Sequence, residues 1–451
     1  MVVFLHLLVV AVCAFECGAA LLDLRGRIGR LLMFSGLGLI HGLAPALTPS
    51  ALLIAEFSYR SRLNAAALAL AGVLLFSLGW RLSDAYRPKI RGISAGLQAT
   101  IESAAGQALL RRLFWFCGVC GVLAWLVSVV ASGTAIRDVF HTARFAYRAT
   151  QESYLEAIAQ YFVLLAIIPG FVGYFLPYRY RAVGIVYTLS MALFLFMVSQ
   201  GTRANAVGLL GGLLMGYVIR HRLPIRRLLA VGGGGLVLLL LSISLYEVRK
   251  SMMRQTIPEM VQTVLSPATY QGALLQDPLN YHEFLVATVE YFPARHPYLN
   301  GATYRRLLVF FLPRKYFDSI KPEDPNMIFA GVVEPGSART LTSIPPTMMG
   351  DGYINFWGWP GITVMFVNGM IFGFVNWKMR TSMLWFVVAG ALYVRLASVA
   401  IRGQPYEVLL LGIWGIVSIW FLGRLFGFQF RDTRIAQPTD YPQWKGVQSA
   451  H

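Results

Sequence analysis

Charged side chains are scarce in this chain of 451 residues. Asp, Glu, Lys and Arg make up 13% of the sequence, whereas 57% is hydrophobic. An ordinary soluble domain carries about 25% charged residues. A soluble fold of this length could not cover its surface with so few charged side chains. The composition predicts an all-α polytopic integral membrane protein. It excludes a secreted disulfide scaffold, a disordered tail protein and a soluble nucleotide enzyme.

Cysteine is also rare, and all four cysteines fall inside apolar runs. Cys117 and Cys120 have the spacing of a redox pair, but Phe114 to Phe116 precede them within one apolar segment, which favours a packing role. No His, Cys, Asp or Glu cluster has metal-ligand spacing, and no Asp-x-Asp motif of nucleotide-sugar enzymes occurs. We therefore expect no metal site and no cofactor.

Acidic residues are outnumbered, with 21 Asp and Glu against 39 Lys and Arg and a net charge of +18. Such an excess of positive charge can indicate binding to nucleic acid, to anionic lipid or to an anionic substrate. The membrane content excludes nucleic acid. In a membrane protein the plainest explanation is that basic loops remain in the cytoplasm.

Apolar runs long enough to cross about 30 Å of hydrocarbon, roughly 20 residues each, predict about eleven transmembrane helices. They lie near 1–22, 31–56, 64–80, 113–132, 153–177, 182–199, 204–219, 228–246, 353–375, 382–400 and 408–424. The predicted organisation is an N-terminal bundle of about eight helices (1–246), a large loop (247–352), three C-terminal helices (353–424) and a cytoplasmic tail (425–451).

The order of charge around the first span predicts orientation. No basic residue precedes it, and Arg25, Arg27 and Arg30 follow it, which is opposite to a cleaved signal peptide. We therefore expect the N-terminus outside. Other basic clusters then fall on the cytoplasmic side: Arg81 to Arg91, Arg111-Arg112, Arg179 to Arg181, Arg220 to Arg227, Lys378 to Arg380, and the tail.

The loop 247–352 then faces outside. Frequent prolines divide it into short helices and turns at the membrane surface. Within it, Tyr281 to Tyr291 has the pattern of an amphipathic helix, and Arg305 to Leu312 is expected to dip back toward the bilayer. Elsewhere, four glycines have the spacing of a closely packed helix: Gly208, Gly211, Gly212 and Gly216.

A second group of basic residues is not explained by orientation, because it falls outside or near the outer ends of spans. Besides those of the long loop, it consists of Arg60, Arg62, Arg137, Arg144, Arg148, Arg203, Arg395 and Arg402. Arg144 and Arg148 share a helical stripe with Arg137 and His141. That stripe fits either an amphipathic helix resting on headgroups or a surface that receives an anionic lipid carrier.

Arg203, Arg395 and Arg402 lie at the ends of apolar spans. Arginine at membrane depth is costly and usually lines a cavity or meets a partner. Guanidinium groups bind phosphate oxygens bidentately, so two or three of them could hold a pyrophosphate without a metal. Pairing with Glu56 or Glu407 is the structural alternative.

Three segments carry a resemblance to a known family. They are Gly201-Thr202-Arg203-Ala204-Asn205, the run Phe311-Leu312-Pro313-Arg314 with Lys321-Pro322, and Thr342 to Tyr353 leading into Phe356-Trp357-Gly358-Trp359-Pro360-Gly361. With the span count and the late outer loop, the chain resembles the Wzy-type O-antigen or oligosaccharide repeat-unit polymerases over most of its length. Arg339 and Gly350 also match the family's spacing of arginine and glycine, whereas Leu214 stands at the corresponding position after Arg203.

The resemblance implies a GT-C-like fold and a metal-independent glycosyltransferase of the bacterial inner membrane, with its active site facing the periplasm. Its substrates would be undecaprenyl-pyrophosphate-linked oligosaccharides, as donor and as acceptor, polymerised into O-antigen, common antigen or capsule. Partners would be the lipid bilayer and, in the pathway, a chain-length regulator and a flippase. No cofactor is implied.

That chemistry needs cations for the leaving pyrophosphate and a base for the acceptor hydroxyl. The predicted catalytic residues are Arg203, Arg339, Glu283 and Arg402. The predicted substrate-binding residues are His282, Lys321, Arg395, Arg144, Arg148, Arg314, Tyr353 and Tyr406. Asp277, Glu290, Asp351 and Glu407 are rival bases, and each of these carboxylates could instead be solvated or cap a helix.

Two other functions fit parts of the pattern. An O-antigen ligase uses the same donor but transfers the glycan to lipid A core. A transporter or flippase of lipid-linked oligosaccharides belongs to a different class. The chain lacks the paired, broken hydrophobic segments that mark many transporters, and its one large outer loop also argues against that class.

Overall fold

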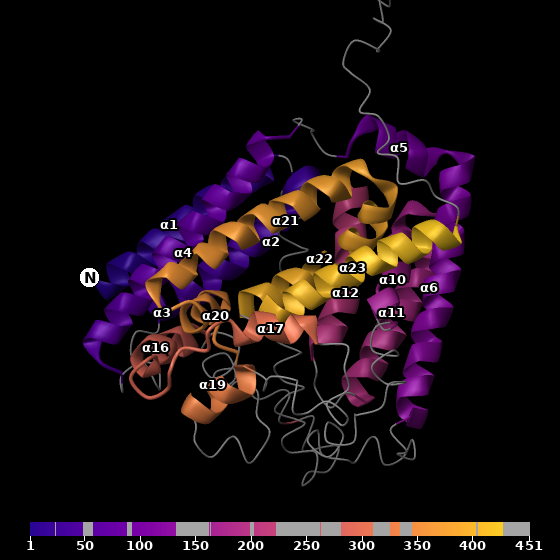
Figure 1. Cartoon of the computed structure of the whole chain (residues 1–451). Coiled ribbons are helices and arrows are strands. Elements are labelled where there is room, and N and C mark those ends of the chain that lie inside the picture. The colour runs from indigo at the N-terminus through magenta and orange to yellow at the C-terminus, as the bar shows by residue number, and fades with distance from the viewer. Residues whose placement is uncertain are drawn as a thin grey trace, which may run out of the picture.

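Long apolar runs fold here into helices, because a helix satisfies every backbone polar group within its own segment. The computed structural model describes residues 1–22, 24–47, 57–87, 93–131, 162, 164–198, 203–221, 262, 281–309, 325–333, 345–402 and 405–426. This described part is all-helical and contains no strand (Figure 1). The expected all-α class is confirmed for it.

The first half of the chain supplies most of the long helices. They are α1 (Val2–Leu21), α2 (Leu24–Gly38), the π-helical turn η1 (Leu39–Leu43), α3 (Ala44–Leu47), α4 (Tyr59–Ala85), α5 (Ala95–Glu102), α6 (Ala104–Ala131), α10 (Ile168–Val172), the 3-10 turn η3 (Gly173–Phe175), α11 (Tyr178–Val198) and α12 (Arg203–Arg220).

The second half begins with short helices and ends with three long ones. They are α16 (Tyr281–Tyr291), α17 (Ala302–Leu308), α19 (Pro325–Val333), α20 (Met348–Asn355), the 3-10 turn η5 (Trp359–Ile362), α21 (Thr363–Thr381), α22 (Met383–Arg402) and α23 (Pro405–Leu425). The amphipathic helix predicted over Tyr281 to Tyr291 is confirmed as α16.

Six helices of the described part are long and apolar enough to cross a membrane, as expected of a multi-pass membrane protein. They are Val2–Leu21, Arg27–Leu47, Tyr59–Ala85, Ala104–Ala124, Trp359–Thr381 and Met383–Ile401. Two shorter apolar helices, Gly208–Arg220 and Leu411–Leu425, fall on expected spans. The span expected near 228–246 lies outside the described residues, as do residues 153–161 and 163 of the span expected near 153–177.

The span expected at 353–375 is displaced along the chain. Residue 353 lies in α20, the chain then turns, and the long helix α21 runs from Thr363 to Thr381. Trp357 and Gly358 adopt positive φ of 58° and 84° in this turn, and Pro360 follows. Such backbone cannot continue an α-helix, so hydrophobicity alone misplaced this boundary.

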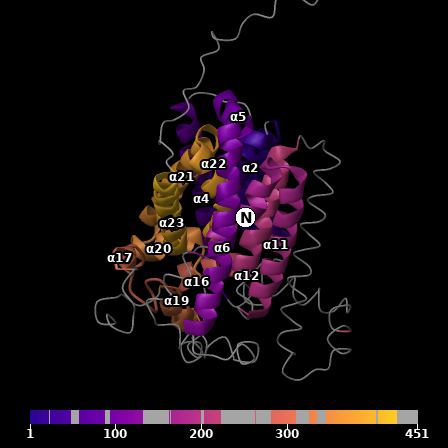
Figure 2. The same cartoon turned by 90° about the vertical axis from the view of Figure 1, so that its right-hand side faces the viewer.

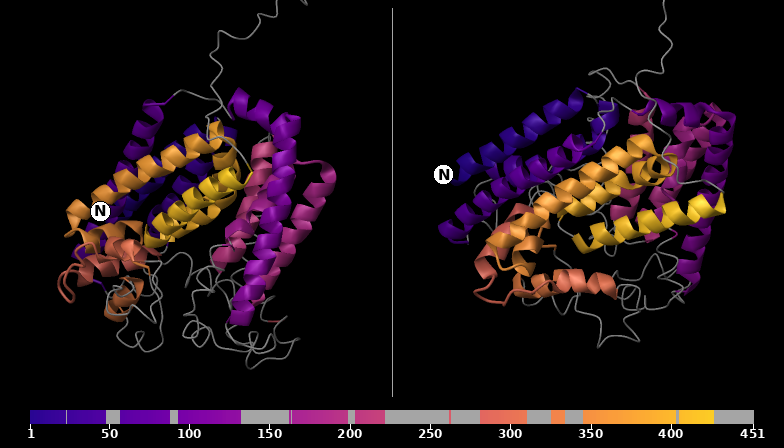
Figure 3. Two further views of the ribbon diagram at one scale, coloured as in Figure 1. Left: turned by 45° about the vertical axis from the view of Figure 1, so that its right-hand side comes forward. Right: turned by 45° about the horizontal axis from the view of Figure 1, so that its top comes forward.

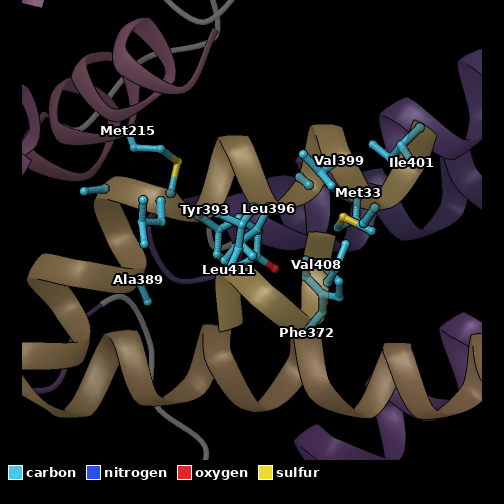
Figure 4. Packing of buried hydrophobic residues seen from close by; sticks show 14 of the residues in the cluster. Met33, Met215, Phe372, Ala389, Tyr393, Leu396, Val399, Ile401, Val408 and Leu411 are labelled. Carbon is cyan, nitrogen blue, oxygen red and sulfur yellow. The ribbon is translucent and has the colours of Figure 1, made fainter. Parts of the chain in front are cut away.

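Close helix packing depends on glycine. A Cβ on Gly216 of α12 would lie 2.7 Å from the carbonyl oxygen of Phe171, and one on Gly212 would lie 3.2 Å from the carbonyl oxygen of Ala391 in α22. The small-residue spacing predicted for this span therefore brings two neighbouring helices close together. Figure 4 shows Met215 of α12 reaching toward α22, whose buried Tyr393 and Leu396 belong to the same core.

The short helices of the 247–352 segment gather at one end of the molecule. Figures 1 and 2 show α16, α17, α19 and α20 together there, with α5 at the opposite end. The two views in Figure 3 keep that separation. Among the basic residues predicted to be cytoplasmic, Arg380 lies at the α5 end, where the backbone N–H of Ser94, just before α5, donates to its carbonyl oxygen at 3.0 Å.

Candidate functional site

Three buried histidines meet where α16 contacts the N-terminal helices. His6 comes from α1, His41 from η1 and His282 from α16, and their side chains are 2%, 0% and 2% exposed. The Nδ1 atom of His6 donates to the carbonyl oxygen of His41 at 2.9 Å. The Nδ1 atoms of His41 and His282 lie 3.3 Å apart, so the N–H of one donates a hydrogen bond to the other nitrogen.

The rings of this histidine cluster (His6, His41, His282) pack edge to face. The centroid of His282 lies 4.6 Å from that of His6 and 5.6 Å from that of His41. Burial lowers the pKa of His282 well below its usual value, and the neighbouring His6 and His41 lower it further. His282 is therefore neutral at physiological pH, the form in which imidazole can accept a proton.

The ring nitrogens of the cluster do not converge on one point, because one faces a carbonyl and two face each other. Within the ranges that the structure describes, no group of His, Cys, Asp and Glu side chains is arranged to hold a metal ion. The arrangement suits proton exchange between imidazoles better than metal binding.

Glu283 follows His282 on α16, and its side chain is 3% exposed. The alternative of a solvated carboxylate is therefore wrong for Glu283. The solvated alternative suits Glu290 better. This residue lies near the end of α16, and its Oε2 atom accepts from the hydroxyl of exposed Ser58 at 2.9 Å. A carboxylate removed from water is the kind of group that can act as a base in a dry site.

A second buried carboxylate, Asp351, lies on α20 and joins it to α17. Its Oδ1 accepts from the hydroxyl of Thr303 at 3.0 Å and from the amide of Asn355 at 3.1 Å, and its Oδ2 accepts from the hydroxyl of Tyr304 at 3.2 Å. Burial raises the pKa of Asp351 to about 7, although these hydrogen bonds act in the opposite direction.

Backbone strain marks the start of α20. Thr347 has φ of 70°, in the region that side chains rarely adopt, and its hydroxyl accepts from the backbone N–H of Gly350 at 3.1 Å. A Cβ on Gly350 would lie 2.9 Å from the hydroxyl of Thr288 in α16. The motif that contains Thr347 and Gly350 thus holds α20 tightly against α16, and strain of this kind often accompanies a functional site.

Tyr353, predicted to bind substrate, belongs to this same packing. It is 9% exposed, and its ring centroid lies 6.1 Å from that of Tyr298. Burial raises the pKa of Tyr353 to about 12. The ring therefore supports the loop between α16 and α17 instead of presenting an open face to a sugar.

The predicted arginines share one end of the pair α12 and α22. These helices run antiparallel, since Gly208 lies beside the Arg395 side chain, with 3.2 Å between an added Cβ and Cδ, and Gly212 lies beside Ala391. Arg203 is the first residue of α12 and Arg402 the last of α22. At 1.5 Å per residue, each is within about 11 Å of the contact between Gly208 and Arg395 along its helix axis.

That end is also the end of the histidine cluster. Helix α2 runs parallel to α22, because Gly29 packs on Tyr393 and Gly36 on Ile401. The chain continues from α2 directly into η1, which carries His41. The structure therefore places the ends of α12 and α22 at the same end of the bundle as α16 and α20; we call this the arginine end.

Other predicted site residues fall outside this geometry. For Arg203, Arg402 and Tyr406 the structure describes the backbone position, and Tyr406 lies at the start of α23. Five further residues lie outside the described ranges: Arg144, Arg148, Arg314, Lys321 and Arg339. Among the rival bases, Asp277 also lies outside them, and Glu407 is placed only by its backbone in α23.

Sequence reasoning missed His6 and His41. Both stand inside apolar runs, and a titratable side chain within a membrane span is costly enough to mark a site. That signal was available, but it gave no indication that the two residues would meet His282. No protein-family model, curated protein or solved structure matches the chain.

Proposed function

We propose that this protein polymerises oligosaccharide repeat units carried on undecaprenyl pyrophosphate, at the periplasmic face of the bacterial inner membrane. One observation carries the proposal. Helix positions of Arg203, Arg395 and Arg402 share an end of the bundle with the buried His282 and Glu283 of α16. This common end supports a site in which arginines would bind the leaving pyrophosphate and α16 would supply the groups for proton transfer.

In the proposed reaction the growing glycan moves as a block. The anomeric carbon of its first sugar forms a bond to a hydroxyl oxygen at the non-reducing end of a newly arrived unit. The bond from that carbon to the phosphate oxygen breaks, and undecaprenyl pyrophosphate leaves with the electron pair. The hydroxyl proton passes to a base of the protein.

The arginines would stabilise the charge that develops on the leaving group. Preorganised guanidinium groups are effective for this in a site that excludes water, because the local dielectric is low. Arg339 of the long loop would complete the set, with Arg314 and Lys321 nearby in sequence. Arg144 and Arg148 would receive the carrier lipid, and Tyr406 would line the same end.

Glu283 is the proposed base, and His282 beside it in sequence would bind the acceptor or relay its proton. An imidazole of the histidine cluster could pass the proton onward by accepting it on one ring nitrogen while it releases the proton of the other, so that no net charge stays in the buried site. Asp351 is less suited, because both its oxygens are engaged by Thr303, Tyr304 and Asn355. The apolar helices would accommodate the two polyprenyl tails.

The test uses purified protein and an authentic lipid-linked repeat unit as the sole substrate. A ladder of products that differ by one repeat unit is expected. A ligase would form product only when lipid A core is added, and a flippase would form no new glycosidic bond. Either outcome would replace the polymerase proposal. A chain-length regulator, if added, should narrow the distribution of product lengths, but the ladder should form without it.

A further inference from the structure

A groove on the outer surface of α1 and α4 has no part in the proposed reaction. Its volume is about 570 Å³, and eight residues line it: Ala11, Val12, Phe15, Glu16, Leu74, Ser77, Leu78 and Arg81. The apolar members are well exposed, with Phe15 at 63%, Leu74 at 48% and Leu78 at 54%. The groove lies on the apolar outer surface of two helices that are long enough to span a membrane.

One end of this groove is charged. Buried Glu16 accepts from Ser77 and from buried Arg30, and its Oε1 atom also accepts from Arg81 through Nε at 2.9 Å and Nη2 at 2.6 Å. The guanidinium carbon of Arg81 lies 5.2 Å from the ring centroid of Phe15. The Arg81 side chain is 49% exposed, so it retains donors that face the groove.

Positive charge exceeds negative charge around this end. The second carboxylate there is Asp84, 3.7 Å from Arg30. Further guanidinium groups lie close enough to Asp84 to interact with it electrostatically: Arg27, Arg87 and Arg380. Among the residues that the structure describes, five guanidinium groups thus surround two carboxylates, and the surplus attracts an anion.

With α1 and α4 spanning a membrane, the charged end of the groove would lie near the lipid headgroups. Arg81 lies four residues before the end of α4, and Glu16 lies five before the end of α1, which is about 6 to 8 Å along each axis. The apolar lining extends from there toward the middle of both helices. A ligand that fits has an anionic group at one end and a hydrocarbon chain at the other.

We infer that the groove between α1 and α4 binds an anionic phospholipid, with its phosphate on Arg81 and an acyl chain along Phe15, Leu74 and Leu78. The site lies at the end of α1 and α4 opposite the histidine cluster. It would fix the tilt of this helix pair in the leaflet by a phosphate contact as well as by hydrophobic fit.

Native mass spectrometry of the full chain in detergent, titrated with phosphatidylglycerol or phosphatidylcholine, tests this. The wild-type protein should hold one phosphatidylglycerol with an affinity about fivefold above that for phosphatidylcholine, since one basic contact contributes about that much. Arg81→Gln should abolish the preference. Arg179→Gln, at the exposed start of α11 near the same end, should keep it.

A second variant leaves the charged groups around Glu16 and Arg81 intact. Leu78→Trp should fill the groove and reduce retention of phosphatidylglycerol by a similar factor. The inference is overturned if phosphatidylcholine binds equally well, if Leu78→Trp retains the lipid, or if a folded Arg81→Gln protein keeps its preference. A lipid-free dimer that loses its contact in Leu78→Trp would assign the groove to a second copy instead.

Discussion

The Nδ1 atoms of His41 and His282 lie 3.3 Å apart, although 241 positions separate these residues in the chain. His41 belongs to a π-helical turn, a feature often found at functional sites, and His282 to a short helix of the outer loop segment. This contact and the packing of His6 on His282 join the outer loop segment to the N-terminal helices.

Replacing His282 should change how stability responds to acid. Because the pKa of His282 is lowered in the folded protein, the unfolded state binds a proton more readily once the pH falls below about 6.5. Stability from this residue is therefore present at pH 7.5 and is lost toward pH 5.5. Thermal melts of His282→Gln at both values should show a smaller loss on acidification than the wild type.

His296→Gln is the control for that experiment. His296 lies just after α16, and its Nδ1 bonds to the carbonyl oxygen of Pro297. It lies outside the histidine cluster, so this variant measures the effect of removing one imidazole elsewhere in the same segment. A wild-type response in His282→Gln would show that His282 does not remain neutral on folding.

Asp351→Asn should produce the opposite change. The pKa of Asp351 is raised to about 7, so the folded state binds the proton more tightly and this residue favours folding at pH 5 relative to pH 8. An amide keeps the shape without the charge. The variant should therefore gain stability relative to wild type at pH 8 and lose that advantage at pH 5, as followed by thermal melts. An equal difference at both pH values would contradict the burial argument.

A bulky residue at Gly216 should separate α12 from its neighbours. A Cβ there already lies 2.7 Å from the carbonyl oxygen of Phe171 and 2.8 Å from the Tyr174 ring. Overpacking of this kind costs about 1–3 kcal/mol or more, so Gly216→Leu should lower the melting temperature. Gly412→Leu in α23, where nothing lies within 4 Å, is the matched control and should be neutral or stabilising.

Removing the charge of Glu16 should be strongly destabilising. Its carboxylate is 1% exposed, forms ion pairs with Arg30 and Arg81, and accepts a hydrogen bond from the Ser77 hydroxyl. Loss of one member of a buried ion pair costs about 3–5 kcal/mol, because the remaining charge stays buried without compensation. Glu16→Gln should therefore reduce the melting temperature and the yield of monodisperse protein. Glu290→Gln, at a half-buried carboxylate that accepts from the Ser58 hydroxyl, should do neither.

Much of the helical fold followed from the sequence because membrane helices are determined by local hydrophobic length. The bounds of α16 were predicted correctly since its apolar and polar residues repeat with helical period. The start of α21 was misplaced because the turn at Trp357 and Gly358 depends on backbone conformation, which hydrophobicity does not report.

The candidate site was less predictable for a different reason. Arg203 and Arg402 stood out individually as arginines at span ends, but their common location follows from the antiparallel packing of α12 on α22. His6 and His41 gain meaning only from contacts across the bundle. Long-range packing of this kind is not encoded in periodicity or spacing.

The central claim is that the arginine end of α12 carries the chemistry. The two ends of this helix offer a matched pair, Arg203 as its first residue and Arg220 as its last. Loss of one charge-stabilising group costs about 10²–10³ in rate. With a purified, lipid-linked repeat unit, Arg203→Gln should therefore slow formation of the product ladder by that factor while Arg220→Gln elongates like wild type; equal elongation by both variants would contradict the account.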